Sequence, residues 1–105
     1  MNPGKLNKKI QIMERGRIPD GGGGYEDALV LIKNTWANVR PASGREKWEA
    51  QQAQSEISHK VTIRYTDLID HSHIIVFNGR EFDIQYIINV NEANRFLEIQ
   101  TLEKQ

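Results

Sequence analysis

Cysteine is absent from this sequence, so neither a disulfide nor a thiolate-bound metal can hold the fold together. The sequence also has no excess of positive or negative charge, because 14 basic residues balance 14 acidic ones. A free-standing nucleic-acid binder usually carries a basic excess, so dedicated, tight binding of DNA or RNA is disfavoured. No apolar run approaches the length of a membrane helix, and the first residues lack the apolar core of a signal peptide. We therefore expect a single soluble domain covering residues 1–105, made in the cytoplasm.

A β-hairpin over residues 74–90 is the strongest local prediction. Two apolar-rich runs, Ile74–Phe77 and Phe82–Val90, are joined by Asn78-Gly79. Asn and Gly tolerate positive φ, which suits both central positions of a type I′ turn between antiparallel strands. The second run alternates, which predicts one buried face and one solvated face. The buried face is expected to carry Phe82, Ile84, Tyr86 and Ile88. Ile87 interrupts the polar face and suggests a second apolar contact.

Further strands are predicted on both sides of this hairpin. Alternating or β-branched runs cover 8–14, 28–40, 57–66 and 95–103. With the hairpin they give about six strands, which favours a mainly β fold, a small antiparallel barrel or sandwich. Of these two we predict the barrel. The side chains expected to form its core are Trp36, Val39, Val61, Ile63, Tyr65, Phe82, Ile84, Tyr86 and Ile88.

Residues 15–27 predict a long flexible loop. Glycine loses the most backbone entropy on ordering, and this segment holds four consecutive glycines and a proline. Long loops in compact domains are often functional. The glycines are not a phosphate-binding loop, because no Lys-Ser/Thr pair or helix follows them. The candidate functional residues of this loop are Arg15, Arg17, Asp20, Gly21, Gly22, Gly23, Gly24 and Tyr25.

A short helix is predicted at residues 43–54. Ser43 followed by Glu46 fits a capping box, and the following residues are good helix formers. Few apolar residues are present, so the helix must lean on the sheet or on another subunit. Trp48 is either a lid on the barrel or an anchor at an interface. The candidate interface residues are Arg45, Lys47, Trp48, Gln51 and Gln52.

Catalytic and metal signatures are weak. The segment 67–73 includes four residues of types that can bind metals, Asp67, Asp70, His71 and His73. The segment is also rich in turn formers, which predicts a solvated connector and not a metal site. No Gly-x-Ser-x-Gly elbow surrounds any serine. We expect no enzymatic activity, no metal and no cofactor.

An ordered set of short motifs resembles the phage head–tail joining proteins, the small connector or stopper proteins of long-tailed phages and prophages. The set runs W-x-x-V-x-P-x-S-G-x-E, an Ala/Gln-rich helix, I-R-Y, N-G-R-x-F-x-I and a closing L-x-I strand. The residues that carry it are Trp36, Val39, Pro41, Ser43, Gly44, Glu46, Ala50, Gln51, Gln52, Ile63, Arg64, Tyr65, Gly79, Arg80, Phe82, Ile84, Leu97 and Ile99. No motif in the set is catalytic, so its specificity rests on the order.

The resemblance implies a non-enzymatic virion protein with a small β-barrel and a helix. It implies a homo-oligomeric ring below the portal that retains packaged DNA and docks the tail. The implied partners are copies of the chain, a portal or adaptor ring, tail-terminator or tail proteins, and duplex DNA passing without sequence preference. Residues 15–27 would then face the channel, and the protein would occupy the host cytoplasm before assembly. Two alternatives remain: an oligonucleotide-binding barrel, and another neck or tail-completion protein.

Overall fold

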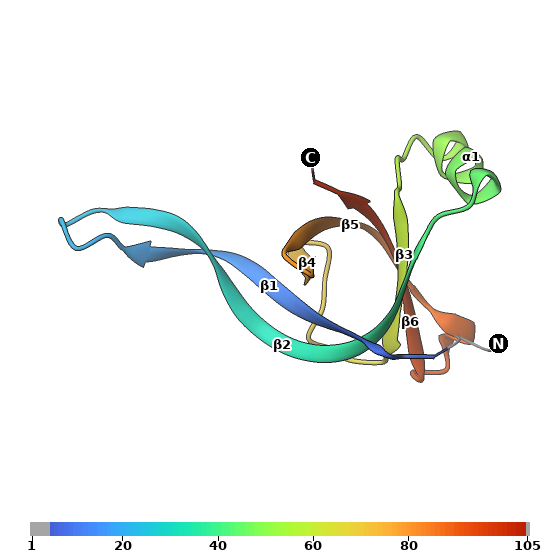
Figure 1. The fold of residues 1–105 in the computed structure, drawn as a ribbon, viewed down its shortest axis with the longest axis horizontal. Helices are drawn as coiled ribbons and strands as arrows, with labels where there is room; N and C mark the ends of the chain where they lie inside the picture. The colour runs from blue at the N-terminus through green and yellow to red at the C-terminus, as the bar shows by residue number, and fades with distance from the viewer. Residues whose placement is uncertain (1–4, 105) are drawn as a thin grey trace.

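The computed structural model describes residues 5–104, which form a closed β-barrel with one helix at its edge and a long hairpin extending from it (Figure 1). The elements are β1 (Lys8–Pro19), β2 (Tyr25–Pro41), α1 (Gly44–Gln52), β3 (His59–Arg64), β4 (His73–Phe77), β5 (Arg80–Asn89), a 3₁₀ turn (Val90–Glu92) and β6 (Phe96–Glu103). Among these residues, no helix has the length and apolar character needed to cross a membrane.

Six antiparallel strands close the barrel in the order β1-β2-β3-β6-β5-β4. The seam is the pairing of β1 with β4, where Gln11 lies opposite Val76 and Glu14 opposite His73. The predicted fold class, a mainly β antiparallel barrel with one short helix, is confirmed.

The β4–β5 hairpin forms where the sequence predicts it. Its two turn residues, Asn78 and Gly79, have φ values of 52° and 75°. Positive φ at both central positions is what a type I′ turn requires. The strands on either side pair from Phe77 opposite Arg80 to Ile74 opposite Asp83.

The core lies inside the barrel and is mostly aliphatic. Its buried members are Ile10, Ile12, Ala37, Val61, Ile63, Ile75, Phe82, Ile84, Leu97 and Ile99. Four predicted core residues are among them, and Val39 packs against this cluster while partly exposed. The predicted positions of Trp36, Tyr65 and Tyr86 are wrong: these side chains are 57%, 41% and 56% exposed. Ile88 is only half-buried.

A register shift explains the error on β5. The pairing of β5 with β6 slips between Ile84 and Tyr86, which leaves Gln85 as an extra residue. A bulge of this kind reverses the faces of all residues beyond it. Ile87 therefore packs against the core, and Tyr86 points outward.

The wrong predictions for Trp36 and Tyr65 have simpler causes. On β2 the inward position belongs to Ala37, which is fully buried, so its neighbour Trp36 must face outward. Tyr65 lies one residue beyond the end of β3, where the alternation of that strand no longer fixes its direction. Its backbone N–H still donates to the carbonyl of Arg95, at 2.9 Å.

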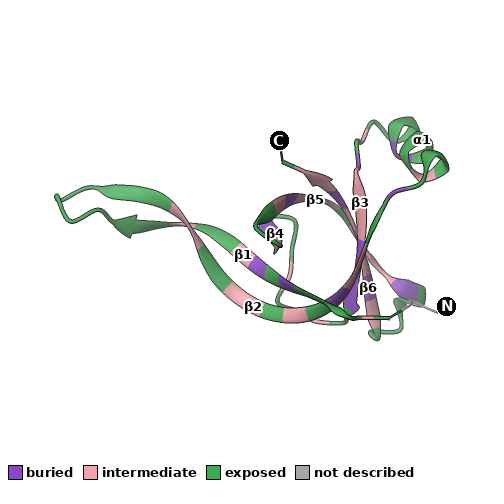
Figure 2. Cartoon of the chain, viewed as in Figure 1, coloured by how far each residue is buried: buried purple, intermediate pink, exposed green. Residues whose placement is uncertain are grey.

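The predicted flexible loop at residues 15–27 is also wrong, because most of it is paired strand. β1 and β2 pair continuously out to Pro19 opposite Tyr25, and only residues 20–24 form a turn. The Asp20 carboxylate accepts hydrogen bonds from the backbone N–H groups of Gly22 and Gly24, at 2.8 and 3.2 Å. Figure 2 shows that the buried residues lie in the barrel and beside the helix, while the distal hairpin is mostly exposed.

Candidate functional site

The distal hairpin, defined here as residues 15–30, presents two faces. Cross-strand pairing puts Arg15 opposite Leu29 and Arg17 opposite Asp27, so these four side chains share one face. The other face carries Gly16, Ala28 and Val30 together with Ile18 and Glu26. A Cβ placed on Gly16 would lie 3.1 Å from the Val30 side chain, so this face packs closely at that point.

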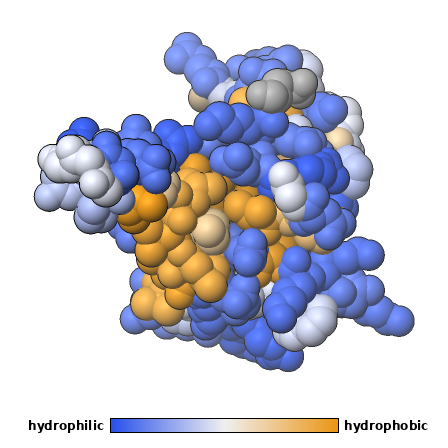
Figure 3. All heavy atoms as spheres, turned by 60° about the vertical axis from the view of Figure 1, so that its left-hand side comes forward, coloured by the Kyte–Doolittle hydropathy of each residue, from blue (hydrophilic) through white to orange (hydrophobic). Residues whose placement is uncertain are grey.

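Large apolar side chains are exposed along this arm. Ile18, Tyr25, Val30 and Leu31 are 41%, 69%, 43% and 47% exposed. Seen from the hairpin end, hydrophobic atoms form a continuous patch beside the tip (Figure 3). Contiguous exposed apolar surface on a small protein marks an interaction site more often than chance.

The charges of the hairpin are loosely paired. Arg15 reaches Asp83 at 3.5 Å, and Arg17 lies 3.8 Å from Asp27, with all four side chains at least 40% exposed. Exposed pairs at such distances contribute little to folding. These charges therefore remain available to a partner.

Helix α1 begins where the capping box predicts. The Ser43 hydroxyl accepts a hydrogen bond from the Glu46 N–H at 3.1 Å, and the Glu46 carboxylate accepts one from the Ser43 N–H at 2.8 Å. The helix ends at Gln52, two residues before the predicted end, and Ala53 is its C-cap.

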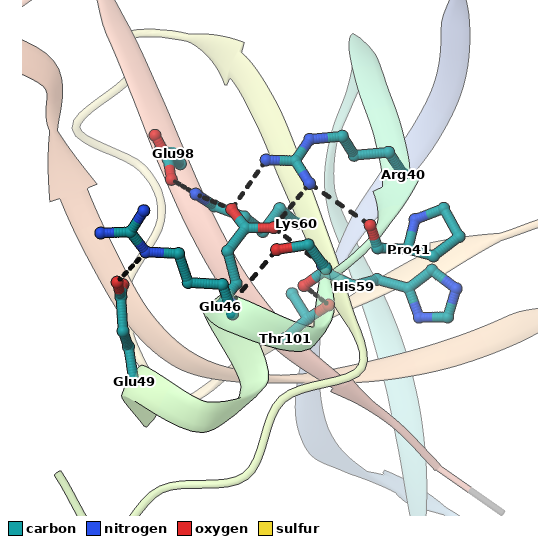
Figure 4. A network of polar contacts seen from close by, with 10 residues as sticks. Arg40, Pro41, Glu46, Glu49, His59, Lys60, Glu98 and Thr101 are labelled. Atoms are coloured by element: carbon teal, nitrogen blue, oxygen red, sulfur yellow. Dashed lines mark hydrogen bonds and ion pairs between the residues drawn. The ribbon is translucent and has the colours of Figure 1, made fainter. Parts of the chain in front are cut away.

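A charged network fixes this helix to the barrel (Figure 4). The two terminal guanidinium nitrogens of Arg40 on β2, Nη1 and Nη2, each donate to one oxygen of the Glu46 carboxylate at 2.8 Å. Lys60 on β3 lies 2.7 Å from the same carboxylate and also pairs with Glu98 on β6. Glu46 thus links the helix directly to β2 and β3, and Lys60 extends the network to β6.

The network shifts the ionisation of its members. The hydrogen bonds from Arg40 hold the pKa of Glu46 far below its ordinary value, with Lys60 and Ser43 adding to the effect. Burial acts to lower the pKa of Lys60, but its two carboxylate partners outweigh that effect and raise it. Arg40, Glu46 and Lys60 are all charged at neutral pH, so charge attaches the helix in addition to the apolar contacts among Ala42, Ala50 and Ile57.

The predicted interface residues do not share one surface. Trp48 is 60% exposed, so it is not a lid on the barrel. Lys47 and Gln51 line a hollow of about 250 Å³ beside Ile57 and Leu102. On the opposite flank of the helix, Ala50, Tyr86 and others line a groove of about 560 Å³. Arg45 and Gln52 are exposed with Trp48 on the outward side of the helix.

The sequence does not predict a second cluster, which surrounds the buried ring of Phe82. Arg80 donates to the Glu103 carboxylate at 2.8 and 2.7 Å, and its guanidinium lies 5.2 Å from the centre of the Phe82 ring. The His59 ring meets the same phenyl ring edge-on at 5.0 Å, and burial lowers its pKa. The signal was present in the N-G-R-x-F motif, where Arg80 and Phe82 lie on one strand face.

Asp70 and His73 form hydrogen bonds that stabilise the turn of the 67–73 connector. Asp70 accepts hydrogen bonds from the backbone and hydroxyl of Ser72, and its own N–H donates to the His73 ring at 3.1 Å. Within the described residues, no three metal-ligating side chains come together.

The whole set of strands, helix and hairpin has a counterpart among known proteins. The sequence matches the family described as phage head completion protein over residues 1–104. The chain belongs to that family. Members are structural proteins of phage particles, so this chain is a virion component with a structural role at the junction of head and tail.

Solved structures support the fold of this head completion protein. A Shigella flexneri 2a protein determined in solution is 24% identical, with a TM-score of 0.77 over 98% of this chain and 96% of the other. A chain from the virion of a native gene transfer agent is 15% identical, with a TM-score of 0.57 over 93% and 94%. No match is found among curated proteins.

Proposed function

We propose that this head completion protein forms a ring below the portal, where it retains packaged DNA and provides a docking face for the tail. The proposal is carried by the family match over residues 1–104. The exposed hairpin supports it, because a ring subunit needs surfaces beyond its own core. No catalytic group is required for this role, and we propose that the protein is not an enzyme.

In the proposed ring, duplex DNA passes without sequence-specific contact. Net charge is zero over the chain, so a channel built from it would hold the phosphate backbone weakly and allow the genome to leave. The proposed partners are other copies of the chain, a portal or adaptor ring, and tail-terminator or tail proteins. Before assembly the free protein would occupy the host cytoplasm.

Complementation tests this role. A phage or prophage whose copy of the gene is disrupted should yield heads that lose DNA to nuclease and remain without tails. Supplying the intact gene should restore nuclease-resistant DNA and joined tails, counted by electron microscopy. Normal particles in the absence of the gene would overturn the proposal. DNA-filled, stable heads without tails would restrict it to docking, as for another neck or tail-completion protein.

One observation favours an oligonucleotide-binding barrel as the second candidate. Trp36 is exposed on the outer face of β2, directly opposite Lys9 on β1. An exposed indole beside a cation can stack on a base and meet a phosphate. A Trp36→Ala variant that loses binding to a fluorescent single-stranded oligonucleotide, measured by anisotropy at low salt, would favour this candidate. Equal, negligible binding by both proteins would exclude it.

A further inference from the structure

The distal hairpin leaves two strand edges unpaired. Within residues 5–104, β2 residues 25–36 have β1 on one side and no strand on the other, because pairing with β3 begins at Ala37. In the same described part of the chain, β1 residues 15–19 have only β2 as a partner strand, because pairing with β4 ends at Glu14. Each edge presents a row of backbone donors and acceptors.

The two edges carry opposite charge at the same distance along the arm. The free part of β1 holds Arg15 and Arg17 and no acidic residue, whereas the tip end of β2 holds Glu26 and Asp27. The hairpin's own register aligns Arg17 with Asp27. The basic part of the β1 edge and the acidic part of the β2 edge therefore lie at the same distance from the tip of the hairpin.

Space is open beside the β1 edge. A hollow of about 580 Å³ there is lined by Glu14 and Arg15 of β1 and by Ser72, His73, Ile74 and Asp83. An added strand there would continue the sheet beyond the start of β4, antiparallel to β1. The β2 strand of another copy has that direction if both hairpins point the same way.

We propose that copies of this protein associate through their hairpins, the β1 edge of one copy pairing with the β2 edge of the next. The contact is heterologous, since each copy uses two different edges, and such contacts can close into a ring. The apolar side chains Ile18 and Val30 then lie on one face of a continuous sheet, and Leu31 lies on the other face. This inference deepens the proposed ring by naming the subunit contact, and it can be tested without a phage.

Cross-linking of two single-cysteine variants gives the first test. The chain has no cysteine, so only introduced thiols react. Ile18→Cys and Ala28→Cys lie on the same face, one on each edge. With a short bis-maleimide, a mixture of the full-length variants carrying tags of different size should give mixed dimers in clear excess over either self-dimer. A mixture of Ile18→Cys with Trp48→Cys, on the distant helix, is the matched control.

Equal amounts of self- and mixed dimers would overturn the heterologous contact. Failure to exceed the Trp48→Cys control at the solubility limit would overturn hairpin pairing altogether, and the edges would then serve a different protein.

Complementary charge reversal gives the second test. Arg17→Glu makes the β1 edge less basic, and Asp27→Lys makes the β2 edge less acidic. Each variant alone should associate more weakly than the unaltered protein in sedimentation velocity, whereas an equimolar mixture should recover association. Recovery follows because opposite charges meet at both kinds of junction in an alternating assembly. Either variant associating as well as the unaltered protein would contradict the proposal. Cross-linking that succeeds while complementation fails would leave this contact intact and remove only the head-completion role.

Discussion

Two large aromatic side chains of this barrel have opposite surroundings. The ring of Phe82 is fully buried, whereas the indole of Trp36 is 57% exposed on the outer face of β2. Phe82→Ala should lower the free energy of unfolding by about 3–5 kcal/mol, because lost transfer energy and an unfilled cavity add. The matched change Trp36→Ala should cost less than about 1 kcal/mol. Chemical denaturation measures both, and similar losses would mean that the indole is buried in solution.

Glu46 gives a pH-dependent expectation. Its pKa is lowered in the folded protein, so its stabilising effect is complete above the ordinary value of 4.5 and declines as the pH falls toward the folded value. Glu46→Gln should cost about 1.5–3 kcal/mol near neutral pH, as expected for hydrogen bonds to a charged group. The difference between the two proteins should shrink in acid.

Glu49→Gln is the control for this measurement. Among the described residues, Glu49 forms an ion pair only with Arg45, at 3.1 Å and largely exposed, and such a pair contributes about 0.3–0.5 kcal/mol. Denaturation across a pH series checks both variants. A Glu46→Gln deficit that does not change with pH would mean that packing, rather than charge, attaches the helix.

At the scale of elements, the sequence predicts the features that depend only on residues close together in the chain. The Asn78-Gly79 turn and the Ser43–Glu46 capping box need only residues close in sequence, and both are present. The bulge at Gln85 has no local signature, so the faces of Tyr86 and Ile88 were exchanged. Ile87 was the one hint, as an apolar residue on a face expected to be polar.

The sequence does not predict the distal hairpin, because four consecutive glycines indicate a flexible loop while the pairing of the residues on either side of them leaves no sign in the composition. Four glycines do form the turn, and Gly21 and Gly23 adopt positive φ there. The residues on both sides are ordered by each other, across β1 and β2, which composition cannot reveal. The network around Glu46 was equally out of reach, because Arg40, Lys60 and Glu98 come from three different strands.

Shortening the arm separates its role from that of the barrel. Residues 17–27 can be replaced by Asn-Gly, since Gly16 and Ala28 are already cross-strand partners. The free energy of unfolding should change by no more than about 1 kcal/mol, because the core lies entirely within the barrel. Denaturation monitored by circular dichroism measures it. Loss of a cooperative transition would instead mean that the arm supports the barrel.

At the scale of the whole molecule, we expect the exposed residues of α1 to contact another virion protein. Reversing charge at Arg45 and Lys47 to Glu should leave the melting temperature nearly unchanged, because exposed helix charges contribute only about 0.2–0.5 kcal/mol each. The same double variant should fail to join tails to filled heads in the complementation assay. Normal joining by this stable variant would remove the helix from the interface.

Trp48→Ala is the companion variant, since its indole is the largest exposed group on this helix. An interface anchor should lose tail joining on truncation while the barrel stays folded. Unfolding of either variant would assign these residues to stability instead.

The seam of the barrel also sets the order of events during synthesis. β1 can pair with β4 only after β4 has been synthesised, since Gln11 lies opposite Val76. In the same way β3 can pair with β6 only after β6 has been synthesised, since Val61 lies opposite Ile99. Contacts so distant in sequence slow folding into the range of milliseconds to seconds. The β1–β2 arm needs only its own neighbouring residues. On the ribosome, therefore, we expect the arm, the surface proposed to meet other copies, to form before the barrel that carries it.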